Sequence, residues 1–114
     1  MTPEIIDGFL AAIPHPAVLI DQTERFIALN PEAAALLGGG VKGRHFATIL
    51  RQPSVTSAVE SCLRDRAPRK ARHLSNDGAQ DTTFVVNLRY VPGVGAVDGG
   101  AVLICFEATT EREQ

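Results

Sequence analysis

The hydrophobic period of the chain changes near Pro68, and this change restricts the possible folds more than any other feature. Before Pro68, apolar residues recur every three or four positions and form one helical stripe. The stripe consists of Val55, Ala58, Val59, Cys62 and Leu63. After Pro68, alternate residues between Thr82 and Val91 are apolar, as in a strand with one buried face. Such a strand needs a helix layer to cover it, so the sequence predicts an α+β fold.

Other segments fill in the element order. The patterns predict an amphipathic helix over 3–13, strands over 17–21 and 25–29, helices over 31–38 and 44–51, and strands over 69–75 and 101–107. Asn30 is expected to cap the helix that begins at Pro31, Ser54 is expected to cap the helix over 54–65, and Asn76-Asp77-Gly78 is expected to form a turn. Strand pairs on both sides of a helical block predict a five-stranded antiparallel sheet with helices on one face. The strand over 101–107 is continuously apolar, which predicts a central position.

Length and composition favour one small globular domain over 1–114. The chain has 114 residues, of which 45% are hydrophobic and 21% charged. A length near 100 residues fits a single core of ordinary size. Two cysteines and the lack of a secretory leader predict a reducing, cytoplasmic location. The longest apolar run is far shorter than the ~20 residues that span a bilayer, so we expect no direct membrane insertion.

Charge is distributed unevenly along the chain. The net charge is −2, but the window from Arg64 to Arg72 carries +4 and the remaining residues carry −6. A chain that is slightly acidic overall is not expected to bind nucleic acid. Arginines in the window could hold an anion, but no aromatic side chains interleave with them for base stacking. A solvated sheet edge therefore explains the window better than a binding site does.

The sequence contains no motif that indicates catalysis or metal binding. Gly38, Gly40 and Gly43 match G-x-G-x-x-G, but they follow a predicted helix, whereas the dinucleotide motif follows a strand. The three histidines lie far apart on different predicted elements. Cys62 and Cys105 have apolar neighbours, which favours core packing over a nucleophilic role. We expect no catalytic residue, no metal ligand and no enzymatic activity in this chain.

Four segments in order resemble the motifs of PAS domains, most closely those of bacterial sensor histidine kinases of the phosphate-regulon type. IPHPAVLID (13–21) resembles the opening strand, and RFIALNPEAAALLG (25–38) resembles the second strand and the helix that begins at an Asn. GRHFATILRQPSVTSAVESCL (43–63) resembles the short helix, the Arg-x-Pro break and the long helix. FEATTERE (106–113) resembles the exit motif that leads into a signalling helix. The resemblance covers nearly the whole chain.

This resemblance implies a sensory or dimerising module that is covalently attached to an output domain, such as a kinase. Asn30 takes the position of the Asn that begins a helix in the family. The cysteine-containing motif of flavin-binding relatives is absent, and residues 54–65 lack the axial His of haem-binding relatives, so neither cofactor is expected. The phosphoacceptor and nucleotide boxes of a kinase are also absent. The catalytic parts are therefore expected outside this chain, which would then be a fragment.

The exit motif also assigns a role to the C-terminal residues. By resemblance, residues 108–114 begin the exit helix, and Thr110, Glu111 and Arg112 form the signal exit. Ala108 stands where the family usually has Asp, and His15 stands where the opening motif usually has Asp. The first departure removes a side chain that usually couples the domain to the exit helix.

Two hypotheses about the site remain open. In the first, Ile5, Ile6 and Phe9 of the opening helix are shared with a second copy, because a helix this short has more apolar residues than one docking face needs. The chain would then be a homodimer. In the second, the chain is the small-molecule sensor of a transcription regulator or another output protein. Its pocket would be lined by Leu29, Leu37, Ile49, Val59 and Leu63. Dimerisation is favoured because this lining has no polar group to orient a metabolite.

Overall fold

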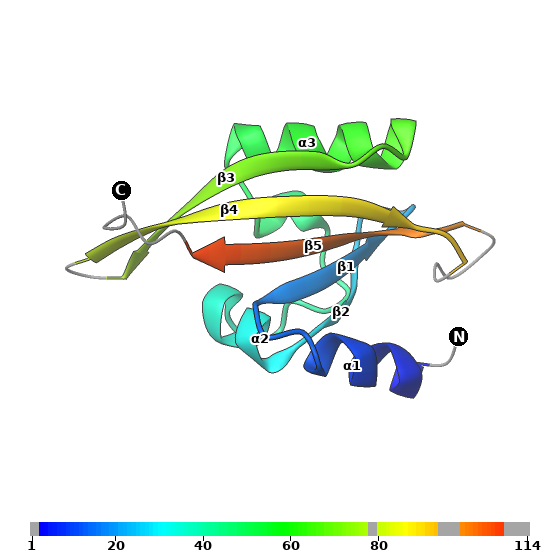
Figure 1. Cartoon of the computed structure of the whole chain (residues 1–114), viewed down its shortest axis with the longest axis horizontal. Helices are drawn as coiled ribbons and strands as arrows, with labels where there is room; N and C mark the ends of the chain where they lie inside the picture. The colour runs from blue at the N-terminus through cyan, green and yellow to red at the C-terminus, as the bar shows by residue number, and fades with distance from the viewer. Residues whose placement is uncertain (1–2, 78–79, 94–98, 109–114) are drawn as a thin grey trace.

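The computed structural model describes residues 3–77, 80–93 and 99–108. The elements in chain order are α1 (Pro3–Ala11), β1 (Ala17–Asp21), β2 (Phe26–Leu29), α2 (Pro31–Leu37), the 3₁₀ turn η1 (Phe46–Thr48), α3 (Pro53–Asp65), β3 (Arg69–Asp77), β4 (Gln80–Val91) and β5 (Ala101–Ala108). These elements confirm the predicted α+β class and element order (Figure 1). No helix in the described ranges is both long and apolar enough to span a bilayer.

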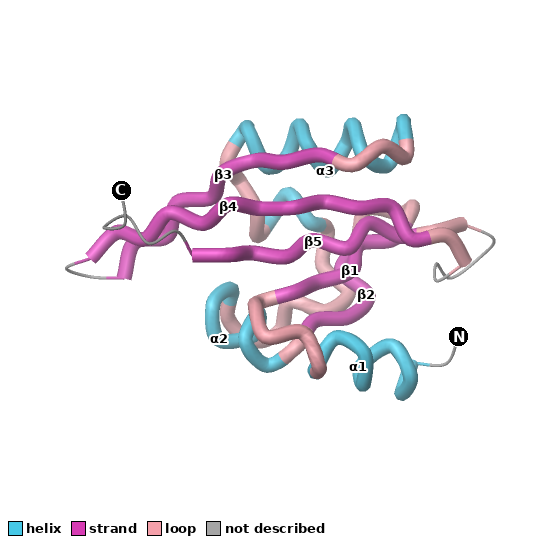
Figure 2. The backbone as a smooth tube through the Cα atoms, in the orientation of Figure 1, coloured by secondary structure: helices cyan, strands magenta, loops and turns pink. Residues whose placement is uncertain are grey.

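All five strands join one antiparallel sheet in the order β2-β1-β5-β4-β3. The apolar strand β5 lies at the centre, as its composition predicts, and pairs with β1 along one edge and with β4 along the other. The charged strand β3 lies at an edge. Figure 2 shows β3 and β4 side by side. Their register pairs Arg69 with Leu88 and Asp77 with Gln80.

Helices cover both faces of the sheet. α2, η1 and α3 pack on one face over the main core, which includes Phe26, Phe46 and Phe106. α1 packs on the opposite face, which we call the open face, over a smaller cluster around Leu10 and Leu19. The prediction of helices on one face is thus confirmed for the central helices, and the opening helix lies on the other. β1 and β5 carry apolar residues on both faces of the sheet, so the open face also needs to be covered.

The start of α3 differs from the prediction. Pro53 is the first residue of the helix, because its missing N–H and fixed φ suit that position. Gln52 occupies the N-cap position without a capping side-chain bond, so the prediction of Ser54 as the cap is wrong. The side chain of Ser54 instead donates to the carbonyl of Arg72 on β3, at 3.0 Å.

Two other predicted boundaries need correction. The helix predicted over 44–51 is reduced to η1, where the imidazole of His45 accepts a bond from the Ala47 N–H. Extended backbone at Gln52, directly before Pro53, separates η1 from α3, as steric contact with a proline ring requires. The turn predicted at Asn76-Asp77-Gly78 begins later, because Asn76 and Asp77 still pair within the β3–β4 ladder. Gly78 lies outside the described residues.

Candidate functional site

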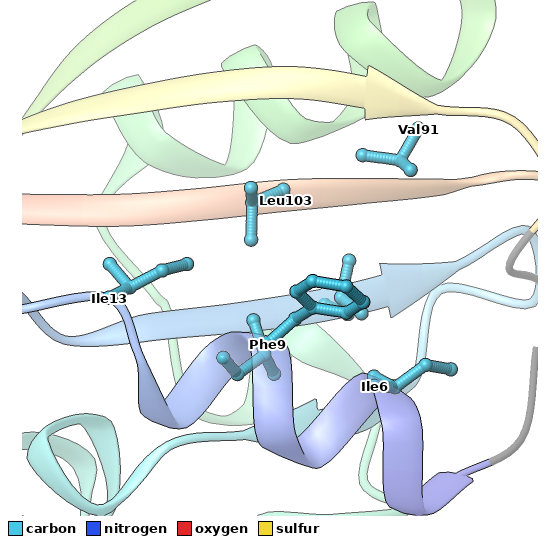
Figure 3. A pocket seen from close by; sticks show the side chains of 7 residues that line it. Ile6, Phe9, Ile13, Val91 and Leu103 are labelled. Carbon is cyan, nitrogen blue, oxygen red and sulfur yellow. The ribbon is translucent and has the colours of Figure 1, made fainter.

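A groove of about 180 Å³ lies between α1 and the open face of the sheet. Its lining is wholly apolar and comes from α1, the segment after it, and strands β1, β4 and β5 (Figure 3). The lining residues are Ile6, Phe9, Leu10, Ile13, Leu19, Val91 and Leu103. Among the described residues, no polar side chain lines the groove to orient a metabolite, so its chemistry suits apolar protein side chains.

The three α1 residues predicted to form a dimer have different environments. A fourth apolar residue of the helix, Leu10, is 3% exposed and anchors α1 to the sheet. Ile6 is half-buried and lines the groove. Ile5 and Phe9 are 48% and 64% exposed, among the most exposed large apolar side chains in the described residues. They lie four positions apart on one side of the helix and form an apolar ridge at the rim of the groove, which Phe9 also lines.

Asn30 holds the chain at the junction of α1, β1 and α2, and its side chain is 2% exposed. Its Oδ1 accepts bonds from the N–H of Ala33, at 2.9 Å, and the N–H of Ala17, at 3.0 Å. The first bond caps α2 and the second fixes the start of β1. The acceptor half of this amide therefore joins a helix on one face of the sheet to a strand within it.

The donor half of Asn30 binds the end of α1. Nδ2 donates to the carbonyls of Leu10, at 2.9 Å, and His15, at 2.8 Å, with a longer contact to Ile13 at 3.4 Å. A helix end needs such partners because its last carbonyls have none within the helix. The sequence indicated the capping role of Asn30. It did not reveal the attachment of α1, because the carbonyls lie 15 to 20 residues away in the chain.

The predicted pocket residues all belong to the main core. Val59 is fully buried, and Leu29, Leu37, Ile49 and Leu63 are half-buried and pack against the same cluster. The large side chains of Phe26, Phe46 and Phe106 are also fully buried within it. The structure thus brings the five predicted residues together, in positions where each contributes to packing. Their role as a ligand pocket stays a prediction.

His73 is a buried titratable residue that the sequence reasoning did not single out. It is 8% exposed and faces the main core from β3. Its ring lies 5.4 Å from that of Phe106 and 6.2 Å from that of Phe84. Burial lowers the pKa of the His73 imidazole from its usual 6.5. The sequence did not reveal that His73 is buried, because β3 is too polar for its hydrophobic pattern to show which residues face the core. The pairing of β3 with β4 was needed to place His73 on the inward face.

Both cysteines are free thiols. Burial raises the pKa of Cys62 above its ordinary value of 9.0, although the Arg69 guanidinium opposes this shift. Burial and the carboxylate of Glu107 both raise the pKa of Cys105. Raised thiol pKa values disfavour the reactive thiolate, in keeping with a packing role.

Other predicted positions are located as follows. The described residues contain no group of three or more His, Cys, Asp or Glu side chains that could hold a metal ion. The signal-exit residues Thr110, Glu111 and Arg112 lie outside the described residues. Ala108 ends β5 and pairs with Phe84.

Comparisons with known proteins identify the fold. No family model and no curated protein matches the chain. The PAS domain of Bordetella pertussis BvgS superposes with a TM-score of 0.70 at 15% identity, covering 96% of this chain and 88% of that one. The PAS domain of an HTR-like protein from Haloarcula marismortui gives 0.66 at 17% identity, with 93% and 90% covered. The PAS domain of nitrogen regulation protein NR(II) from Vibrio parahaemolyticus gives 0.63 at 9% identity, with 92% and 98% covered. The chain therefore has the PAS fold.

Proposed function

We propose that this chain is a non-catalytic sensory and dimerisation module that biases an attached output domain. Its output domain would be a histidine kinase of a bacterial two-component system, of the phosphate-regulon type that the sequence motifs resemble. The module would act in the cytoplasm as a homodimer. The PAS fold supports the proposal, as does the likeness to a domain of a nitrogen regulation protein.

The observation that carries the proposal is the apolar ridge of Ile5 and Phe9 beside the open groove. Large exposed apolar side chains next to an apolar hollow mark protein interaction sites. A second copy that presents its own ridge would bury both surfaces at once, as a two-fold interface requires. A signal that prefers one dimer arrangement would then shift the population of two states by its differential affinity.

Signal exit is proposed at Thr110, Glu111 and Arg112, which follow β5. β5 lies between β1 and β4 in the sheet. A movement of the β1–β2 pair relative to the β3–β4 pair would therefore displace the C-terminal end of β5. The proposal gives the chain no catalytic group and no cofactor of its own.

Native mass spectrometry of the chain tests the proposal. We expect a dimer with no added mass, and monomers after deletion of residues 1–12. The variant Phe9→Gln should weaken the dimer at least tenfold without loss of the fold, because Phe9 is 64% exposed. Leu74→Gln, at a side chain that is 60% exposed near the far end of the β3–β4 hairpin, is the matched control and should leave the dimer intact.

Other outcomes of this experiment would contradict the proposal. A wild-type monomer, or a dimer that persists after deletion of residues 1–12, would disprove the α1 interface. A discrete bound mass would favour the second hypothesis, a small-molecule sensor whose pocket includes Leu29, Leu37, Ile49, Val59 and Leu63. Substitution of Val59 by Ala should then alter ligand retention, whereas Phe9→Gln should not.

A further inference from the structure

Three exposed cations lie on the open face of the sheet. They are Lys70 and Arg72 on β3 and Arg89 on β4, and we call them the basic strip. Arg89 is paired with Leu103, whose side chain lines the α1 groove, and directly opposed residues of an antiparallel pair share a face. The partners of Lys70 and Arg72 on β4 lie two and four residues before Arg89. Since successive side chains of a strand alternate between faces, these two cations lie on the open face as well.

Two shallow hollows lie between the side chains of the basic strip, and Lys70 lines both of them. Asn87 lines one hollow and Val85 lines the other. These two residues of β4 are two positions apart, which places the hollows side by side at a spacing of about 7 Å. The first hollow, of about 200 Å³, is lined by Pro68, Arg69, Lys70, Asn87 and Arg89, and the second, of about 220 Å³, by Lys70, Ala71, Arg72 and Val85.

The basic strip has no counter-charge among the residues that the structure describes. Arg64 and Arg69 each form an ion pair with Asp65, at 3.4 and 2.6 Å. The three cations of the strip form no ion pair and no side-chain hydrogen bond with any other described residue. By register, the nearest carboxylate on this face is that of Glu107, which lies on β5, two strands from β3, and 3.8 Å from His15.

Protection of a sheet edge explains only part of the basic strip. β3 is an edge strand, where cations discourage pairing with the strand of another molecule. β4 lies between β3 and β5 (Figure 1), so Arg89 protects no edge, and it also lies outside the basic window of residues 64–72. Like charges on neighbouring strands repel each other. An anion in the hollows would remove this repulsion, which favours a binding role.

We propose that the basic strip binds a small soluble polyphosphate, with one phosphate group in each hollow. Lys70, Arg89 and the amide of Asn87 hold the first group, and Lys70 and Arg72 hold the second. A terminal phosphate carries close to two negative charges and three acceptor oxygens, so one group can bond both cations of a hollow. A carboxylate has one charge and two oxygens, and it would leave one cation of each hollow unbalanced. An arginine guanidinium also matches phosphate through paired hydrogen bonds.

A soluble ligand fits this site better than an anionic bilayer does. The residues outside 64–72 carry a net charge of −6, so a negatively charged membrane surface would repel most of the molecule. A small anion responds mainly to the strip itself, because salt screens charges that are more than about 10 Å away. This inference goes beyond the proposed function and does not require the α1 dimer. Because the hollows are shallow, we expect the ligand to exchange with solvent and to add no retained mass to the purified chain.

Titration with tripolyphosphate at constant ionic strength, followed by ¹H–¹⁵N NMR, tests the site. We expect saturable shifts centred on the amides of Lys70, Arg72, Asn87 and Arg89. Inorganic phosphate fills one hollow, so its Kd should be at least tenfold higher than that of tripolyphosphate. Lys70→Gln/Arg89→Gln should raise the tripolyphosphate Kd at least tenfold. Arg72→Gln, which weakens the second hollow alone, should reduce the preference for tripolyphosphate over phosphate. The spectrum of each variant also shows whether it is folded.

The matched control is Lys42→Gln/Arg44→Gln, which removes the same two charges at exposed residues between α2 and η1. It should leave the tripolyphosphate Kd unchanged. Shifts that do not saturate, or the same Kd for the wild type and Lys70→Gln/Arg89→Gln, overturn this inference and leave the proposed dimer untouched. A monomeric wild type that binds tripolyphosphate supports this inference while contradicting the proposed function.

Two further arms of the experiment address other anions that could meet the strip. Asp98, Glu111 and Glu113 lie outside the described residues. Asp98→Asn/Glu111→Gln/Glu113→Gln should leave the tripolyphosphate Kd unchanged, whereas a Kd at least tenfold lower would show that the chain's own carboxylates occupy the strip and would overturn the inference. The wild type should not sediment with phosphatidylglycerol vesicles. Sedimentation with these vesicles in the absence of tripolyphosphate binding would assign the strip to a bilayer instead.

Discussion

At the scale of the residue, Asn30 supports more of the fold than any other polar side chain described here. It makes two acceptor bonds and two short donor bonds while 2% exposed. Asn30→Ala leaves buried partners without a bond, and each such group costs about 1–3 kcal/mol. We expect urea unfolding to show a loss of at least about 3 kcal/mol in the free energy of unfolding.

Asn30→Asp tests the donor bonds of this side chain separately from its acceptor bonds. The carboxylate can still accept from Ala33 and Ala17, but it cannot donate to the carbonyls of Leu10 and His15. Hydrogen exchange should therefore show faster exchange in α1 with α2 still protected. Equal protection of α1 in the wild type and in Asn30→Asp would argue against the attachment described above.

We expect His73 to contribute to the pH dependence of stability near neutrality. Burial lowers its pKa in the folded state, so the unfolded chain takes up the proton first as the pH falls. The stability that this residue contributes is fully present above its unfolded pKa near 6.5 and is lost progressively as the pH falls below that value. Urea unfolding between pH 7.5 and 5.5 should show a smaller decline for His73→Leu than for the wild type. His15→Gln, which removes a partly exposed histidine 3.8 Å from Glu107, is the control substitution. Parallel curves for the wild type and His73→Leu would contradict this expectation.

At the scale of the element, α3 protects the outer edge of β3. The Gln52 side chain accepts from the N–H of Leu74 and donates to its carbonyl, both at 2.8 Å, and Ser54 bonds the carbonyl of Arg72. An uncovered edge offers these groups to another strand. Gln52→Ala should cost about 1 kcal/mol in the free energy of unfolding and speed amide exchange at Leu74. Gln52→Glu keeps the acceptor and should preserve protection of that amide. Unchanged exchange in Gln52→Ala would show that Gln52 does not cover the edge.

At the scale of the whole molecule, the two faces of the sheet have unequal cores. The face covered by α2, η1 and α3 holds the three largest fully buried side chains, Phe26, Phe46 and Phe106. The open face holds a small cluster in which Leu10 is the one fully buried residue of α1 among those described. Deletion of residues 1–12 should therefore leave the sheet folded. Circular dichroism of the deletion variant checks this, so that a loss of the dimer can be distinguished from a loss of the fold. A face with so little cover is also the one left for a partner.

The sequence by itself determined the class, the element order and the central position of β5, because hydrophobic period and continuous apolar runs depend on near neighbours in the chain. It also indicated Asn30 as a cap, through the adjacent Pro31. Only the tertiary structure decided that α1 lies on the opposite face, that Gln52 rather than Ser54 occupies the N-cap position of α3, and that both side chains bond the edge strand β3. Those features join residues from different elements, and cross-strand register and packing set such contacts. No local pattern of residues encodes them.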